Sequence, residues 1–307
     1  MKKIESVAVI GMGALGILFG KEIMDGVGRD AVCYIMDKNR YEKYKGAEVV
    51  INGEPVIMPM KPAEEAKPVD LILVATKGYG LEEAMETMKN CVADHTIIIS
   101  VLNGISSETL LGERFGHEKL IHSVSQGMDA MKFGNSLQFT KCGQLHLGLV
   151  EGQMKENLDT VIEFFDRAKV PYVLEEDILY RMWSKFMLNV GGNQTCMVYG
   201  ANYSQLVTEG EPQDTFLGAM REVIALAQAE GINLGEKDLE EYVEITKKLH
   251  PEGIPSMAQD RRNGKPTEVE LFAGTVRSMA KKHGIPTPIN DFLYEEAKRI
   301  EKEYLGQ

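Results

Sequence analysis

The chain has 307 residues, which is long for one compact core, so two domains are expected. Hydrophobic residues make up 44% of it and charged residues 26%, a globular composition that excludes a disordered or low-complexity chain. The net charge of -12 argues against nucleic acid and anionic membrane surfaces as partners, because polyanions would be repelled. No apolar run reaches the roughly 18 residues that a membrane-spanning helix needs.

The four cysteines, Cys33, Cys91, Cys142 and Cys196, lie far apart and form no C-x-x-C pair. Free thiols are therefore expected, and they fit a reducing cytoplasm. The six histidines show no metal-ligand spacing with each other or with the cysteines, so no metal site is predicted.

The first half alternates short apolar runs with helical periodicity, which is typical of a doubly wound α/β sheet. Strands are expected at residues 4–10, 31–36, 71–75, 96–101 and 172–174, and helices at 14–24, 81–90 and 157–168. Between residues 120 and 149 the apolar period changes to two, which predicts later, partly antiparallel strands at the sheet edge.

After residue 176 the pattern becomes helical throughout. Helices are expected at residues 178–199, 214–230, 236–249, 268–283 and 289–303, with breakers at Gly231, 251–255 and 284–288. The sequence thus predicts an α/β domain over residues 1–176 and an all-helical domain over residues 177–307.

A glycine-rich run joins the first expected strand to the first expected helix: Gly11-Met12-Gly13-Ala14-Leu15-Gly16. In this G-x-G-x-x-G pattern the first glycine permits a tight turn, and the second lets a pyrophosphate approach the backbone. The third lets the helix and strand pack closely. The helix N-terminus supplies free N–H groups for the phosphates. The run therefore predicts a dinucleotide site, and a glycine-rich turn without a ligand is the alternative.

Asp37, at the end of the second expected strand, stands 21 residues after Gly16, where an acidic side chain binds the ribose hydroxyls of NAD(H). A 2′-phosphate at this place would face a carboxylate. Lys38 and Arg40 favour the other coenzyme, because either could pair with the 2′-phosphate of NADP(H); as solvated surface charges they would decide nothing. These residues leave NAD(H) and NADP(H) both open.

In the helix expected at residues 178–199, Lys185, Asn189 and Asn193 recur at i, i+4 and i+8, so they share one helix face. The flanking residues are apolar, which indicates a buried helix whose polar groups need partners. Gly191-Gly192 is costly inside a helix and predicts a close approach of coenzyme, of substrate or of another helix. An exposed polar stripe is the alternative.

A second polar segment follows, in which Ser256 opens the run Ser-Met-Ala-Gln-Asp and Thr267 precedes Glu268. Thr267 is expected to cap the next helix, with Glu268 in its first turn, which is by itself a sufficient structural reason for both.

Taken together, these segments resemble the ketopantoate reductases (2-dehydropantoate 2-reductases), in order, at similar spacing and over nearly the whole chain. The resemblance is carried by Gly11-x-Gly-Ala-Leu-Gly16, Thr76-Lys77, Asn103-Gly104, Lys185-x3-Asn189-x3-Asn193, Ser256-Met-x-Gln-Asp260, Thr267-Glu268 and Gly284-Ile-Pro-Thr-Pro288. It implies a Rossmann-like dinucleotide-binding domain plus an all-helical domain. It also implies reduction of ketopantoate to (R)-pantoate with NADPH, on the route to pantothenate and coenzyme A.

The resemblance also implies roles by position. Lys185 would be the general acid, and Glu268 would hold the substrate hydroxyl. A lysine near its ordinary pKa of about 10.4 is charged at neutral pH, so it can polarise a carbonyl and protonate it. The implied substrate contacts are Asn103, Asn189, Asn193 and Ser256. The implied coenzyme contacts are Gly11, Met12, Gly13, Ala14, Leu15, Gly16, Asp37, Lys38, Lys77 and Asn103.

Two departures from the family pattern stand out. Asp37 lies at or next to the position where the family places an arginine for the 2′-phosphate, which brings NAD(H) into question beside NADP(H). Where the family often reads Asn-Pro-Leu-Thr, this chain reads Asn193-Gln194-Thr195-Cys196, which alters the floor of the pocket.

The leading hypothesis is a cytoplasmic, NAD(P)H-dependent ketopantoate reductase, with the helical half closing over the nicotinamide. One alternative keeps the chemistry and changes the substrate to another 2-oxo acid. A buried Glu268 facing only methyl groups argues against it, because that charge would be unpaired. The other alternative is a dinucleotide sensor without turnover, against which the proton-donating Lys185 argues. The partner expected is a small 2-oxo acid, and a homodimer is left open.

Overall fold

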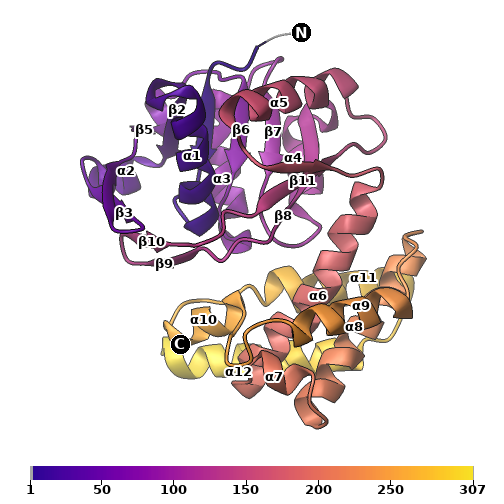
Figure 1. Ribbon diagram of the computed structural model, residues 1–307. Coiled ribbons are helices and arrows are strands. Elements are labelled where there is room, and N and C mark those ends of the chain that lie inside the picture. The colour runs from indigo at the N-terminus through magenta and orange to yellow at the C-terminus, as the bar shows by residue number, and fades with distance from the viewer. Residues whose placement is uncertain (1–2, 307) are drawn as a thin grey trace. The chain divides into compact units, whose positions relative to one another are not determined.

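The computed structural model describes residues 3–306, and its internal contacts divide it into two compact units (Figure 1). The first unit comprises the chain up to Asn103 together with Ser107–Ile178. The second comprises Gly104–Ser106 together with the chain from Leu179 onward. Residues 1–2 and 307, which the expected domain limits include, lie outside the described residues.

An eight-stranded sheet forms the centre of the first unit, in the order β12-β11-β8-β7-β6-β1-β2-β5. Neighbouring strands are parallel except β8 and β11, which run antiparallel. The bounds are β1 (Val7–Ile10), β2 (Val32–Met36), β5 (Met60–Pro62), β6 (Leu71–Val74), β7 (Ile97–Ser100), β8 (Leu120–Gln126), β11 (Gln144–Gly148) and β12 (Tyr172–Leu174). The predicted α/β fold with an antiparallel edge is confirmed.

Helices cover both faces of this sheet. They are α1 (Ala14–Val27), α2 (Lys38–Tyr44), α3 (Leu81–Met88), α4 (Ser107–Phe115) and α5 (Lys155–Ala168), with short 3-10 turns η1 (Arg29–Ala31), η2 (Ala63–Glu65), η3 (Gly78–Gly80), η4 (Lys89–Cys91) and η5 (His117–Lys119). Along β1, Val7 and Val9 join a core with α1 and α5, while Ala8 and Ile10 join a separate core with α3 and α4. Because both faces are buried, the strands read as continuous apolar runs.

A second, four-stranded sheet was not predicted. Its strands are β3 (Glu48–Ile51), β4 (Glu54–Ile57), β9 (Met131–Phe133) and β10 (Ser136–Gln138), in the order β4-β3-β10-β9. All strands within residues 120–149 were predicted to lie at the edge of the main sheet. Two of them, β9 and β10, belong to the second sheet instead. Strands of three or four residues are too short for a period of two to be read reliably.

The second unit is helical. Its elements are α6 (Ile178–Tyr199), α7 (Tyr203–Leu206), α8 (Glu211–Ala229), α9 (Glu236–Lys247), α10 (Ser256–Arg262), a π-helical turn η6 (Glu270–Gly274), α11 (Thr275–His283) and α12 (Pro288–Leu305). Buried aromatic and aliphatic side chains of α6, α8, α11 and α12 make one core, against which Ile105 of the loop after β7 also packs. Within residues 3–306, no helix combines the length and apolarity needed to cross a bilayer.

The prediction of a single regular helix at residues 268–283 was wrong for its first turn. The π-helical turn begins at Glu270, and Thr267 does not cap it. Instead, the Thr267 backbone N–H and hydroxyl both donate to Glu301 Oε1 of α12, each at 2.6 Å. A charged acceptor binds these two donors more strongly than a local cap could.

One testable consequence concerns the crossing of α1 and α5. A Cβ at Gly26 would lie 1.9 Å from the Ala168 carbonyl oxygen, and backbone cannot yield as a side chain can. Gly26→Ala should therefore lower the free energy of unfolding by about 1–3 kcal/mol. Urea denaturation measures this. Gly235→Ala is the matched control, since Gly235 has an extended backbone and open space around the added Cβ. Equal losses in the two variants would contradict a tight crossing.

Candidate active site

The glycine-rich turn has the geometry that its sequence predicts. Gly11 adopts φ +108°, and a Cβ there would lie 2.5 Å from the Ala75 carbonyl oxygen at the end of β6. A Cβ at Gly16 would lie 2.2 Å from the Gly11 carbonyl oxygen, so the helix packs directly on the turn. Gly13 precedes α1 without any side-chain cap, which leaves the first N–H groups of the helix for an anion.

The predicted coenzyme residues of the first unit gather at one edge of the sheet. Asp37, Lys77 and Asn103 follow β2, β6 and β7, and the glycine turn follows β1. Because these strands are parallel, their carboxyl ends meet at the same edge, where open α/β sheets bind ligands. Lys38 opens α2 beside Asp37 and is exposed.

Two buried polar atoms at this edge lack hydrogen-bond partners within the described residues: Asp37 Oδ2 and Thr76 Oγ1. Asp37 Oδ1 accepts from the Arg40 backbone N–H at 2.9 Å, so the carboxylate caps α2 and is held in place. Arg40 Nε lies 3.4 Å from Asp37 Oδ2, and its guanidinium also donates to Glu83 at 3.1 Å. Asp37 Oδ2 has an ion-pair partner in Arg40 but accepts no hydrogen bond in the described chain, so it can accept one from a ribose hydroxyl. The arginine is already shared between two carboxylates.

In the second unit, α6 presents the predicted stripe. Asn193 Nδ2 donates to Asn189 Oδ1 at 3.2 Å, one turn away. Ser256 Oγ and the Met257 N–H, both at the start of α10, donate to Asn193 Oδ1 at 3.0 and 3.1 Å. The structure therefore brings Asn189, Asn193 and Ser256 together. Because the Asn189 amide oxygen accepts the hydrogen bond from Asn193, the Asn189 amide nitrogen is oriented as a donor.

Lys185 lies one turn before Asn189 and interacts electrostatically with Glu268. The Glu268 side chain is 4% exposed, between α10 and η6. Burial lowers the pKa of Lys185 to about 8, because removal from water disfavours the charged amine, and the Glu268 carboxylate offsets part of this effect. The site thus contains an amine that gains and loses a proton near neutral pH.

Gly191 serves a helix crossing. A Cβ there would lie 2.7 Å from Met220 and 2.9 Å from the Phe216 ring, both on α8. Of the partners that the sequence left open for this glycine pair, the structure gives another helix.

Two other buried polar residues are Glu108 in the first unit and Gln194 in the second; sequence analysis assigned no role to Glu108 and named Gln194 only as part of an altered pocket floor. Glu108, at the start of α4, is 3% exposed, and burial raises its pKa to about 7. The hydrogen bond that the Ser107 hydroxyl donates to this carboxylate lowers the pKa and offsets part of the effect. Gln194 follows Asn193 and is fully buried. Glu108 does not break the local helical pattern, so it gave no signal in the sequence.

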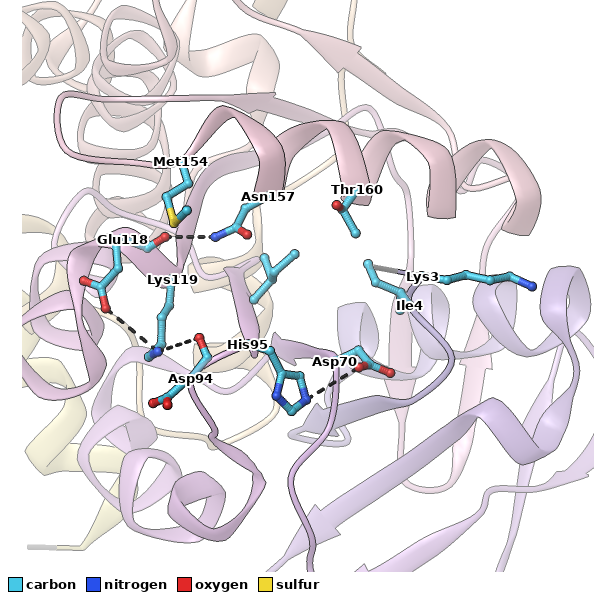
Figure 2. Close-up of a pocket in the computed structure, with 11 residues that line it drawn as sticks. Lys3, Ile4, Asp70, Asp94, His95, Glu118, Lys119, Met154, Asn157 and Thr160 are labelled. Carbon is cyan, nitrogen blue, oxygen red and sulfur yellow. Dashed lines mark hydrogen bonds and ion pairs between the residues drawn. The ribbon is translucent and has the colours of Figure 1, made fainter. Parts of the chain in front are cut away.

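The cavity drawn in Figure 2, of about 230 Å³, lies within the first unit. It is lined by residues that precede strands, such as Ile4, Asp70, His95 and Lys119, and therefore lies at the amino edge of the sheet. His95 Nε2 points at Asp70 Oδ1 at 3.6 Å, and Lys119 donates to the Asp94 carbonyl at 2.9 Å (Figure 2). None of the predicted site residues lines it.

The family is shown by comparison with known proteins. Residues 7–152 match the family model described as ketopantoate reductase PanE/ApbA, and residues 177–301 match the model of its C-terminal part. The chain therefore belongs to the ketopantoate reductase family, an oxidoreductase family, and the resemblance seen in the sequence is confirmed.

Individual relatives span nearly the same length. The chain is 25% identical over 287 residues to a 2-dehydropantoate 2-reductase of Streptococcus pyogenes serotype M1, covering 92% of this chain and 93% of the relative. It is 24% identical over 300 residues to the 2-dehydropantoate 2-reductase of Aquifex aeolicus (strain VF5), covering 95% and 96%.

Solved structures share the fold. A D-mandelate dehydrogenase with NADH and anilino(oxo)acetate superposes with a TM-score of 0.86 at 22% identity, covering 97% of this chain and 99% of that one. A dimeric ketopantoate reductase from Staphylococcus aureus has a TM-score of 0.80 at 20% identity, with the same coverage.

The electrostatics of Lys185 can be tested without turnover. In protein labelled by 13C reductive methylation, one amine signal should titrate near pH 8 and be missing in Lys185→Arg. In Glu268→Gln the pKa of that amine should fall further, because the carboxylate that favours the charged form is gone. NMR titration measures both. An amine whose pKa is the same with and without the Glu268 carboxylate would contradict the pairing.

Proposed function

We propose that this member of the ketopantoate reductase family reduces ketopantoate to (R)-pantoate, with a nicotinamide coenzyme as hydride donor. The observation that carries the proposal is the buried Glu268 beside Lys185, on the side of α6 that also holds Asn189 and Asn193. Ketopantoate has a 2-oxo group, a carboxylate and a hydroxyl. A protonated amine, an amide donor and a carboxylate acceptor complement these three groups in turn.

The coenzyme would be held by the first unit, in the domain proposed for residues 1–176. The turn at residues 11–16 and the N-terminus of α1 suit the pyrophosphate, and Lys77 and Asn103 stand at the same edge. When bound, NAD(P)H supplies the hydride that reduces the carbonyl carbon. Asp37 Oδ2 accepts no hydrogen bond in the described chain, so it suits an adenosine ribose hydroxyl, and its charge would repel a 2′-phosphate. We therefore propose NADH as the preferred form.

Lys185 would be the general acid, in the domain proposed for residues 177–307. Its charged amine would polarise the substrate carbonyl and then protonate the oxygen as the carbon is reduced. A pKa of about 8 suits this step, because the amine is mostly protonated at neutral pH and gives up its proton readily.

The neighbouring side chains would orient the substrate. Glu268 would accept a hydrogen bond from the substrate hydroxyl, in addition to its interaction with Lys185. The amide nitrogen of Asn189 would donate to the substrate carboxylate. Ser256 would act with Asn193, whose amide oxygen it already fixes.

The reaction itself is the first test. Purified protein with ketopantoate should oxidise NADH, followed at 340 nm, with a higher kcat/KM than with NADPH. Asp37→Ala should weaken this preference by about tenfold, because one good hydrogen bond to the ribose and the repulsion of a 2′-phosphate are both lost. A matched change, Lys38→Ala, should leave the preference for NADH in place.

Three outcomes would contradict parts of this proposal. Preference for NADPH would overturn the role of Asp37 and leave the reductase intact. Faster turnover of another 2-oxo acid, such as phenylglyoxylate, would overturn the substrate. Coenzyme binding without reduction of any 2-oxo acid tested would favour the dinucleotide sensor.

The proton donor gives a distinct signature. Lys185→Ala should lower kcat for reduction by about 10²–10⁴-fold while coenzyme affinity is unchanged. In the unaltered enzyme, reduction should slow as pH rises through about 8, because the amine loses the proton it donates. Oxidation of pantoate should speed up over the same range, because that direction needs the neutral amine. A pH profile for reduction that is the same with and without Lys185 would exclude it as the acid.

A further inference from the structure

Gln194 is fully buried on α6, directly after Asn193, and both the nitrogen and the oxygen of its amide form hydrogen bonds. Its nitrogen donates to the Val190 carbonyl at 2.9 Å and to Asn290 Oδ1 at 3.2 Å. Its oxygen accepts from the Ala273 backbone N–H at 3.0 Å. The orientation of the amide is determined, because a carbonyl can only accept and a backbone N–H can only donate.

In the π-helical turn η6, the Ala273 N–H is the donor that has no backbone acceptor in the helix. The Phe272 N–H bonds back four residues to the Glu268 carbonyl at 3.1 Å, and the Gly274 N–H bonds back five residues to the Val269 carbonyl at 3.0 Å. The hydrogen-bond spacing changes from four to five residues between Phe272 and Gly274, so the Ala273 N–H has no helical carbonyl to donate to. A buried N–H without a partner is costly, so the Gln194 oxygen makes the irregular turn possible.

The irregular turn in turn determines where Glu268 lies. A π-helical turn holds one residue more than an α-helical turn. If η6 became regular helix, the residues before it would rotate by about 100° around the helix axis relative to α11. Glu268, two residues before η6, would then leave the neighbourhood of Lys185 on α6.

A second set of contacts fixes Gln194 itself. Asn290, whose oxygen receives the Gln194 amide, donates to Glu222 Oε2 at 2.7 Å. The other oxygen of Glu222 accepts from the Ile289 N–H at 2.7 Å. Three helices, α6, α8 and α12, thus hold the amide that supports η6.

We propose that Gln194 is a positioning residue that sets the preference for a hydroxylated substrate, by holding η6 in the π-helical form that keeps Glu268 beside Lys185. This inference rests on the proposed function, in which Glu268 accepts the substrate hydroxyl. Gln194 touches neither substrate nor coenzyme and acts through Ala273 and the backbone that leads to Glu268.

The measured quantity is discrimination: the ratio of kcat/KM for ketopantoate to that for 3,3-dimethyl-2-oxobutanoate, which lacks the hydroxyl. Gln194→Met keeps the volume and removes both hydrogen-bonding groups. It should lower discrimination by about tenfold, mainly through KM for ketopantoate, because the carboxylate is displaced from the hydroxyl. Turnover of the deoxy substrate should fall by less than about threefold, and coenzyme affinity should not change.

Two control variants separate positioning from loss of stability. Met197→Leu changes another fully buried residue of α6, one that belongs to the apolar core, and keeps its volume, so discrimination should stay as it is. Val223→Ala removes buried volume from α8 and lowers stability without touching the network. It should leave discrimination unchanged even where its melting temperature falls as far as that of Gln194→Met.

Gln194→Glu decides the question if Gln194→Met does not fold. It retains the oxygen that accepts from Ala273, and burial favours the neutral acid, whose hydroxyl can still donate to Asn290. Discrimination should therefore stay within about threefold of the unaltered enzyme. Loss of discrimination in Gln194→Glu, or full discrimination in Gln194→Met, would overturn the inference.

Glu268→Ala separates this inference from the proposed function. If it abolishes discrimination while Gln194→Met does not, the role of Glu268 stands and that of Gln194 falls. If Glu268→Ala lowers turnover of both substrates equally, the proposed role of Glu268 is wrong, and the inference about Gln194 falls with it.

Discussion

The helical unit holds one amine largely removed from water, on the polar face of α6. Lys185 is followed on α6 by Phe186 and Met187, which belong to the apolar core, and burial lowers the pKa of its amine to about 8, below the value of 10.5 for a free lysine. Between these two values the unfolded chain binds more protons than the folded one, so stability rises with pH over that window. Below it, the buried charge lowers the stability of the fold, and Glu268 offsets part of this cost.

The polar groups around this amine form a continuous framework, so each is held by its neighbours. Asn193 is fixed by Asn189, Ser256 and the backbone of α10. Gln194, one residue on, fixes the irregular turn that follows Glu268. Substrate recognition in the proposed reaction would therefore depend on contacts between α6, α10 and η6 more than on any single side chain.

Much of this arrangement could be predicted from the sequence, because its signals are local. The runs that form β1 and β6 are apolar because both sheet faces are buried, and the bounds of α6 were predicted as the structure has them. The spacing of Lys185, Asn189 and Asn193 placed them on one face, and the structure brings the two asparagines into contact.

Other features could not be predicted, because residues distant in the chain determine them. The π-helical turn needs an acceptor for the Ala273 N–H from a residue 79 positions earlier. Thr267 is a residue type that often caps helices, but here it donates to the carboxylate of Glu301, 34 residues later. Such contacts leave no periodic trace in the segments that they shape.

The loop after β7 has a consequence for how the chain can be divided and how it is synthesised. Ile105 packs against the core of the helical unit, although the chain up to Asn103 and again from Ser107 to Ile178 belongs to the α/β unit. The residues from Leu179 onward therefore do not contain the whole of their own core. On the ribosome, the α/β unit emerges with Ile105 still lacking its apolar surroundings, so the last step of folding waits for the C-terminal helices and couples the two units.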